Sequence, residues 1–419
     1  MANLGQVSDF IRSIHASLAA GSPSSLNGLR VLSKRNEGSL FLDRSESAQF
    51  DEAVAALRKT FGKKPDISQK TVEQYLRDAL FGALDLQKRS QAPFEDRLAL
   101  AIDELKASLA KLPVDYKCYL PLAGCDASGL PWTFGAVRLV VFNETQVKHI
   151  VAAAGRTRND ASVLGVLEGV QRAASWNQPV AIVTVPARDD DAARDLATKR
   201  VQQTVDCMNF FVDLIPYNHG WVYLPGEAAS VLGVSPVTGT DGSVSALFQW
   251  QGPLRPFSVQ SLKTTASLRP ALSRVHRMLR EQPGSKLDQS VLASVQWAGR
   301  ASAEQKKEEA FILFAIALET LVLPDSSTQE LTYRLRVRAA HLLGHDANAR
   351  KEISQLIGHL YNVRSRIVHS GFYEVTDEDL GRLKAIVIRC VLRTLLHRRI
   401  RQLKTPEELA SWFDYRVLH

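Results

Sequence analysis

The last third of the chain is organised around one stretch, Tyr361-Asn362-Val363-Arg364-Ser365-Arg366-Ile367-Val368-His369-Ser370-Gly371. It holds an arginine and a histidine with four residues between them, near the end of a predicted helix over residues 349–368. At about 100° per residue, Arg364 falls inside the apolar face of that helix. An arginine there needs a carboxylate, a subunit interface or a bound anion, because an unpaired buried charge is costly. The apolar face comprises Ile353, Leu356, Ile357, Leu360 and Ile367.

The pattern R-x4-H alone is also compatible with an ordinary helix end. In that interpretation the arginine complements the helix dipole and the histidine faces solvent. A second charged residue, Glu319, favours a functional interpretation of the pattern. Glu319 is the only charge in the apolar run from residue 310 to residue 323, which is too short to span a bilayer.

Glu319 therefore predicts a buried core helix that carries one carboxylate. Buried carboxylates are usually paired. Arg364, or Arg338 on the helix between, is the natural partner. The pair could be purely structural or part of a functional site, and the sequence leaves both interpretations open.

Three separated motifs carry a family resemblance over about residues 300–400. They are Ala317-Leu318-Glu319-Thr320-Leu321, then Glu330-Leu331-Thr332-Tyr333-Arg334-Leu335 with Arg338-Ala339-Ala340 and Leu342-Leu343-Gly344, and last Leu360 to His369. In this order they resemble the ApeA-like branch of the HEPN family (higher eukaryotes and prokaryotes nucleotide-binding). The resemblance implies an all-α helical bundle at the C-terminal end of the chain.

In that family R-x4-6-H is the signature of metal-independent ribonucleases, many of them toxins or antiviral effectors. The resemblance thus implies an endoribonuclease that cleaves RNA by attack of a ribose 2′-OH on the adjacent phosphate. It also implies a homodimer formed through this domain. Many of those enzymes carry Asn, Asp or His directly after the arginine, where this chain has Ser365.

The chemistry of the two side chains suits such a reaction. His369 can transfer protons near neutral pH, since the unperturbed pKa of histidine is about 6.5. Arg364 can contact two phosphate oxygens at once. On an unbroken helix the two residues diverge by roughly 140°. They converge only if the helix unwinds near Ser370-Gly371, or if two subunits bring their motifs together.

We therefore predict a homodimer with a composite site, in which Arg364 and His369 are catalytic and Glu319 orients Arg364. Further candidates for contact with the RNA substrate are Asn362, Ser365 and Arg366. A non-catalytic module that binds RNA, a nucleotide or a protein partner is the alternative. A broader role in antiphage defence, with a phage-derived trigger, is compatible with the ribonuclease.

Charge is also consistent with an anionic partner. The chain has a net charge of +8 and an isoelectric point near 9.3. Basic residues crowd the last predicted helix, which runs from Thr376 to about Leu403. They form either a solvated helix face or a contact to an RNA backbone. The predicted RNA-binding residues are Arg389, Arg393, Arg398 and Arg399.

Cysteine and histidine usage predicts neither a metal site nor a cofactor. The four cysteines are scattered and no pair has the spacing of metal ligands. The ten histidines form no grouping such as H-E-x-x-H. The N-terminus lacks the pattern of a signal peptide, so we expect a cytoplasmic protein without membrane partners.

The chain as a whole is predicted to be α+β, in three parts. Residues 1–112 are expected to be mostly helical, apart from a loop over residues 22–48. Residues 113–256 are expected to form an α+β domain, for which the resemblance implies a sensor or substrate-selecting role. Residues 257–419 are expected to form the HEPN-like helical domain. The middle domain has four predicted strands, near residues 116–122, 137–142, 180–185 and 246–250, and predicted helices at about 159–176 and 189–212.

Overall fold

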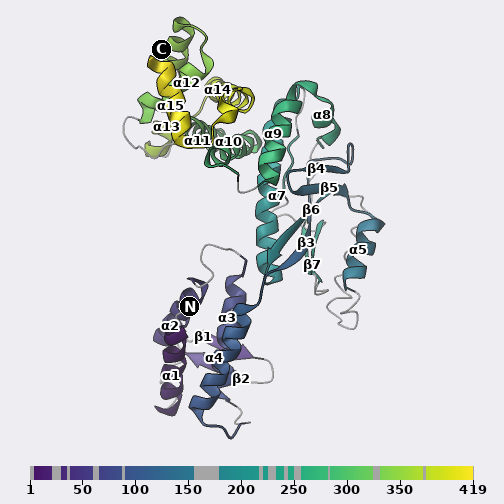
Figure 1. The fold of residues 1–419 in the computed structure, drawn as a ribbon, viewed down its shortest axis with the longest axis vertical. Coiled ribbons are helices and arrows are strands. Elements are labelled where there is room, and N and C mark those ends of the chain that lie inside the picture. The colour runs from purple at the N-terminus through teal and green to yellow at the C-terminus, as the bar shows by residue number, and fades with distance from the viewer. Residues whose placement is uncertain are drawn as a thin grey trace. The chain divides into compact units, whose positions relative to one another are not determined.

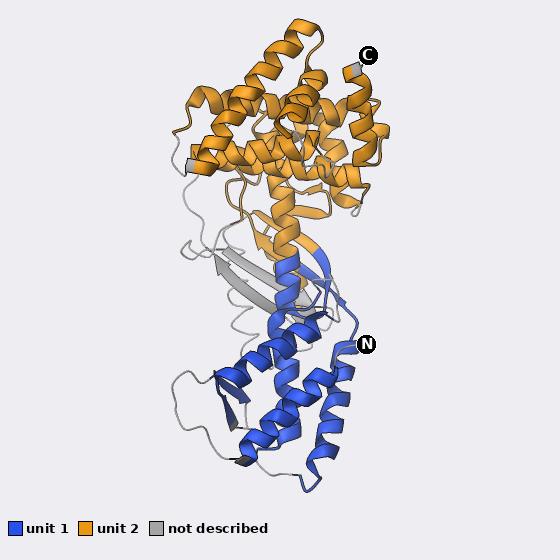
Figure 2. Cartoon of the chain, turned by 90° about the vertical axis from the view of Figure 1, so that its left-hand side faces the viewer, with its two compact units in different colours: residues 1–117, 184–196, 237–243 blue, residues 118–183, 197–236, 244–419 orange. Residues whose placement is uncertain are grey.

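The chain is a mostly helical α+β protein with two small sheets. It divides into two compact units (Figure 2). The first contains residues 1–117, 184–196 and 237–243, and the second contains residues 118–183, 197–236 and 244–419. The computed structural model describes residues 4–20, 30–34, 38–59, 66–86, 90–154, 179–216, 220–224, 233–239, 244–249, 256–281, 284–323, 331–370 and 374–418.

Four helices and a hairpin form most of the first unit (Figure 1). Their apolar faces meet in one core, where Phe10, Phe50 and Phe81 are buried. The elements are α1 (Leu4–Ala20), β1 (Arg30–Lys34), β2 (Gly38–Leu42), α2 (Arg44–Lys59), α3 (Gln69–Leu84) and α4 (Phe94–Ala110).

The hairpin corrects the prediction of a loop over residues 22–48. β1 and β2 pair antiparallel, with Leu32 opposite Leu40, and both leucines are buried. Each strand has five residues and turns only one or two apolar side chains inward. Such a short alternation gives little periodic signal, and the hairpin is stabilised by its packing on the helices.

α2 also begins inside the predicted loop, at Arg44, whereas two other helix starts follow the sequence closely. The Ser68 hydroxyl accepts a hydrogen bond from the backbone of Thr71, as expected for the cap of α3. Asp189 accepts one from the backbone of Ala192 at the start of α7 (Asp190–Val212). The acidic start of α7 therefore serves as a helix cap, as predicted. Asp189 also accepts a hydrogen bond from the backbone of Ser68, which ties the two caps together.

The larger sheet has six strands in the order β4-β5-β6-β3-β7-β8. All four predicted strands are present, and β4 and β7 were not predicted. β4 pairs antiparallel with β5, and β5 pairs antiparallel with β6. α5 (Glu144–Ala154) follows β5, and the helix predicted at 159–176 lies outside the described residues. The strands are β3 (Val114–Pro121), β4 (Trp132–Phe134), β5 (Val137–Val141), β6 (Pro179–Ala187), β7 (Gly233–Gly239) and β8 (Val244–Gln249).

The turn between β4 and β5 is held by a histidine from α9 (Arg269–Arg280). The backbone of Gly135 donates a hydrogen bond to His276 Nδ1 at 3.1 Å, and the His276 ring donates one to the backbone carbonyl of Thr133. Burial, and then the charge of Arg280, lower the pKa of His276 below its usual value. Protonation would place a hydrogen on Nδ1 and remove the acceptor that Gly135 uses.

We expect acid to weaken this contact. Because the pKa of His276 is lower in the folded chain than the unfolded value of about 6.5, its contribution to stability is complete above that pH and is lost as pH falls below it. His276→Gln should therefore lose less stability than wild type between about pH 7.5 and about pH 5.5. Urea unfolding at both pH values measures this difference. His345→Gln, at an exposed histidine, is the control, and an equal pH response in wild type and His276→Gln would contradict the prediction.

The remaining helices belong to the second unit. α10, α11 and α14 share a buried interior that includes Val295, Phe314, Leu318 and Val387. Thr376 caps α14 through the backbone of Asp379, as predicted. The elements are α8 (Val259–Thr264), α9, α10 (Lys286–Ala303), α11 (Lys307–Val322), α12 (Leu331–Leu343), α13 (Ala347–Ser370), α14 (Asp377–Leu396) and α15 (Pro406–Leu418).

The end of α14 differs from the prediction. The helix stops at Leu396, and after a short turn a single 3-10 turn covers Ile400–Gln402. Ile400 is buried, as is Phe413 of α15, so packing returns the chain to the helical core after Leu396. Arg398 and Arg399 therefore lie in the turn after the helix rather than on it. Among the described residues, no helix is both long and apolar enough to cross a membrane.

Candidate functional site

The ion pair expected between Glu319 and Arg364 is present in the second unit. Glu319 lies in the last turn of α11, and Arg364 lies on the facing helix α13. Arg364 Nε lies 3.6 Å from Glu319 Oε1. Each side chain is 32% exposed, so the pair is half-buried rather than fully buried as the apolar run predicted. A partly exposed pair keeps its charges accessible from one side.

Tyr361 completes the group. Its hydroxyl donates a hydrogen bond to the same oxygen, Glu319 Oε1, at 2.8 Å. Burial, and then the Glu319 carboxylate, raise the pKa of Tyr361, so the hydroxyl stays protonated as a donor. The Arg364 Nε is buried and has no partner within hydrogen-bonding distance. One carboxylate oxygen therefore orients both side chains of α13.

The histidine of the R-x4-H pattern lies elsewhere on the same helix. α13 is helical without a break through Ser370, and His369 is exposed. At about 100° per residue, His369 points roughly 140° away from Arg364. Unwinding between the two residues is thus excluded as a way to bring them together in one chain. Of the two routes expected from the sequence, the one that uses two subunits remains.

His369 instead shares a helix face with the three predicted substrate contacts. Asn362, Ser365 and Arg366 all lie within about 60° of it around α13. All four side chains are exposed. The structure therefore divides the predicted residues into an exposed polar face of α13 and an inner group around Glu319.

Arg338 of α12, the alternative partner of Glu319, is buried and makes other contacts. It is only 5% exposed, donates a hydrogen bond to the backbone carbonyl of Val322 and lies 3.8 Å from the carboxylate of Asp414. Its guanidinium also lies over the ring of Phe413. These contacts join the end of α11 to α15, and they give Arg338 a structural role.

Two side chains of α13, Tyr361 and His359, make contacts that were not predicted from the sequence. Tyr361 stands three residues before Arg364, a spacing that places both on one side of a helix, so its part in the ion pair could have been inferred. His359 contacts Asp379 at the start of α14, with 2.9 Å between His359 Nε2 and Asp379 Oδ1. Asp379 is buried, and its sequence context indicates only a helix cap.

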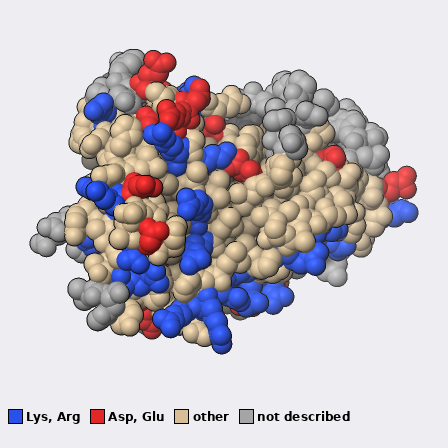
Figure 3. Space-filling model, turned by 90° about the horizontal axis from the view of Figure 1, so that it is seen from above, with Lys and Arg blue, Asp and Glu red and all other residues tan. Residues whose placement is uncertain are grey.

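The predicted RNA-binding arginines are all exposed, but they do not share one helix. Arg389 and Arg393 lie on α14, whereas Arg398 and Arg399 lie in the turn that follows. The view from above in Figure 3 shows groups of Lys and Arg side chains on part of the surface. Exposure of these four side chains is compatible with contact to an RNA backbone.

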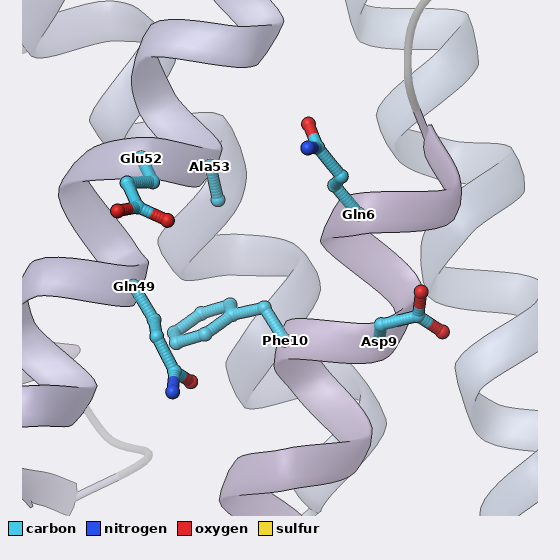
Figure 4. A pocket seen from close by; sticks show the side chains of 6 residues that line it. All are labelled: Gln6, Asp9, Phe10, Gln49, Glu52 and Ala53. Carbon is cyan, nitrogen blue, oxygen red and sulfur yellow. The ribbon is translucent and has the colours of Figure 1, made fainter.

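The first unit contains a small surface pocket. It lies between α1 and α2 and has a volume of about 250 Å³, below the 300–1,000 Å³ typical of small-molecule sites (Figure 4). Its walls carry the carboxylates of Asp9 and Glu52, which disfavour phosphate. Its lining residues are Gln6, Asp9, Phe10, Gln49, Glu52 and Ala53.

Within the described part of the chain, no three His, Cys, Asp or Glu side chains gather as metal ligands would. All four cysteines are buried as free thiols. No protein-family model, curated protein or solved structure was found to match the chain, so the family resemblance of residues 300–400 stays a prediction.

Proposed function

We propose that the chain is a metal-independent endoribonuclease of the HEPN type, with Arg364 and His369 as its catalytic residues. The observation that carries the proposal is the arrangement on α13. An arginine is oriented by a carboxylate and a tyrosine, and an exposed histidine ends the same helix. The proposal also includes the finer fold assignment, in which α10 to α15 form a HEPN helical bundle.

In the proposed reaction the ribose 2′-oxygen attacks the adjacent phosphorus. A bond forms between O2′ and phosphorus, and the bond between phosphorus and O5′ breaks. The products are a 2′,3′-cyclic phosphate and a free 5′-hydroxyl. The proton of the 2′-OH goes to a base, and a proton is delivered to O5′. His369 serves this proton transfer, because an imidazole can both accept and donate a proton.

Arg364 stabilises the negative charge that builds on the phosphate oxygens during the attack. Glu319 and Tyr361 are positioning residues, since they contact Arg364 or the oxygen that holds it. The exposed neighbours of His369 hold the RNA strand next to the reacting phosphate. These neighbours are Asn362, Ser365 and Arg366.

The reaction needs Arg364 and His369 at one phosphate, although they point to different sides of one helix. We therefore propose a homodimer in which α13 of one copy supplies Arg364 and α13 of the other supplies His369. A two-fold axis makes two equivalent composite sites. Cytoplasmic RNA is the proposed substrate, and antiphage defence with a phage-derived trigger is the proposed setting.

Cleavage of a mixed RNA pool in the presence of EDTA tests the proposal. Wild type is expected to cleave, and Arg364→Ala and His369→Ala are each expected to lower the rate by about 100-fold or more. Arg382→Ala, an exposed arginine paired with Glu378, is the control and should cleave like wild type. Full cleavage by both site variants would reject the assignment of the site.

One observation favours a non-catalytic module as the second candidate. Arg364 already has a carboxylate partner in its own chain, which is the arrangement of a structural ion pair. Such a module would bind RNA, a nucleotide or a protein partner without cleaving it. RNA binding by wild type, with no cleavage at any RNA concentration and the same binding by His369→Ala, would favour this candidate.

A further inference from the structure

Six basic side chains gather where four helices of the second unit end or begin. His341 is in the last turn of α12, Arg350 is in the first turn of α13, and Arg393 is in the last turn of α14. Arg399 follows α14, and Arg416 is in the last turn of α15. His397, which ends α14, is the sixth. We call this group the basic cluster.

Specific contacts hold the basic cluster together. The His341 ring donates a hydrogen bond to the backbone carbonyl of Arg416. The Arg416 guanidinium lies 5.3 Å from the centre of the Trp412 ring, and the His397 ring meets the same tryptophan edge-on at 5.4 Å. These contacts fix the positions of His341, His397 and Arg416, but they leave some nitrogen atoms of the cluster without a hydrogen-bond partner.

Three nitrogens of the basic cluster are buried without a hydrogen-bond partner. They are Nε of Arg350, Nε of Arg416 and Nδ1 of His341. Buried polar atoms in folded proteins are nearly always paired, and each exception calls for an explanation such as a missing ligand. Two of these three nitrogens are guanidinium donors that lack an acceptor, so the charges of Arg350 and Arg416 are incompletely paired within the chain.

The charges in the basic cluster repel one another. Burial lowers the pKa of Arg416, and the positive charges of Arg350, Arg393 and Arg399 lower it further. Among the described residues, the charges that shift this pKa are all arginines. Burial, followed by arginines of the cluster, also lowers the pKa of His341 and of His397. The ends of three helices offset part of this repulsion, by about half a charge each at most.

The acidic residues nearby have other partners. Asp346 accepts a hydrogen bond from the backbone of Ala349, which is the main cause of its lowered pKa, ahead of His345 and Arg350, and it contacts His345 at 2.8 Å. Asp414 faces Arg338. A group of like charges therefore remains, and an anion bound at the exposed guanidinium groups of Arg393 and Arg399 would supply the missing negative charge.

We infer that Arg350, Arg393, Arg399 and Arg416 form a binding site for phosphate groups, distinct from the proposed catalytic site. Planar guanidinium groups bind phosphate through two parallel hydrogen bonds, which makes arginine the preferred residue for such a site. Arg350 and His369 are nineteen residues apart on α13, or about 28 Å along the helix. One phosphate cannot reach both, so the two sites can be tested separately.

The phosphate can belong to an RNA backbone or to a free nucleotide, and the test includes both. Binding of inorganic pyrophosphate to the full chain is measured by isothermal titration calorimetry at low salt. We expect saturable binding to wild type and a loss of affinity of about tenfold or more in Arg393→Gln/Arg399→Gln, because the double substitution removes two positive charges that can hydrogen-bond to phosphate oxygens. Both residues are exposed, so this variant should fold. Arg350→Gln/Arg416→Gln should lose at least as much affinity.

The matched control removes the same charge elsewhere. Arg280→Gln/Arg382→Gln replaces two exposed arginines that pair with Glu281 and Glu378, and it should change the affinity by less than about twofold. Competition by a short RNA then identifies an RNA backbone as the natural ligand, and tighter binding of ATP without RNA competition identifies a nucleotide. Absence of saturable binding to wild type, or an equal loss in cluster and control variants, would overturn the inference.

The outcome does not depend on the ribonuclease. His369→Ala should bind pyrophosphate as wild type does, because the basic cluster lies far along α13 from His369. A chain that binds pyrophosphate but cleaves no RNA would keep the phosphate site and reject the proposed reaction. A chain that cleaves RNA but does not bind pyrophosphate would keep the proposed reaction and reject the phosphate site.

Discussion

Mixing Arg364→Ala chains with His369→Ala chains is expected to restore RNA cleavage that neither variant shows alone. In the proposed composite site, each phosphate meets Arg364 of one copy and His369 of the other. A mixed dimer then has one site with both residues mutated and one site with both intact. Each mixed dimer has one intact site of two, so purified mixed dimers should show about half of wild-type activity.

The physical reason is the unbroken helix between the two residues. Helix α13 runs through both positions, so their divergence of roughly 140° is fixed within one chain. If both residues acted in one chain, each mixed dimer would contain only damaged sites. The measurement is the cleavage rate of the co-expressed variants, purified through two different tags so that only mixed dimers are assayed.

A chain with both substitutions provides the control for complementation. When Arg364→Ala/His369→Ala is co-expressed with either single variant, no site regains both residues, and the rate should stay at the level of the single variant. Purified mixed dimers of the two single variants that remain inactive would contradict the composite site. Failure of the two tags to co-purify would contradict the dimer itself.

The sequence predicted the inner half of this site because the signal there is local. Glu319 is the one charge in an apolar run, and Arg364 lies inside an apolar helix face, so each needed the other. The structure pairs them at 3.6 Å. Tyr361 was harder to assign, because a tyrosine on a half-buried helix face can serve packing alone.

The basic cluster shows what a sequence cannot reveal without the packing. Its arginines come from α13, α14, α15 and the turn after α14, and no spacing pattern links them. The sequence instead grouped Arg389 with Arg393, Arg398 and Arg399, because these residues follow one another closely. The end of α14 at Leu396 separates them, and burial of Ile400 is a tertiary effect that overrides helix propensity.

The strands show the same division between local and tertiary signals. The run of residues 180–185 predicted β6 correctly, because it is rich in β-branched side chains, and from Val183 onward buried and exposed residues alternate as in a strand with one buried face. The hairpin of β1 and β2 was missed. Its inward residues Leu32 and Leu40 are buried in the helical core of the first unit, and strands of five residues are too short for their alternation to stand out in the sequence.

The largest loss of stability is expected from Gly299→Ala in α10. A Cβ at this position would lie 1.7 Å from the backbone oxygen of Asp206 and 2.9 Å from the backbone nitrogen of Phe210, both in α7. Backbone cannot move aside as a flexible side chain can, so the two helices must separate. The Arg300–Asp206 ion pair, 2.7 Å long, lies beside this contact and would be strained as well.

We therefore expect a loss of about 3 kcal/mol or more in the free energy of unfolding, or no folded protein at all. Gly381→Ala in α14 is the matched control, because a Cβ there meets nothing within 4 Å. That substitution should stabilise the chain by about 0.5–1 kcal/mol through helix propensity. Urea unfolding followed by circular dichroism measures both variants. If Gly299→Ala proves as stable as wild type, α7 and α10 do not approach as closely as the structure has them.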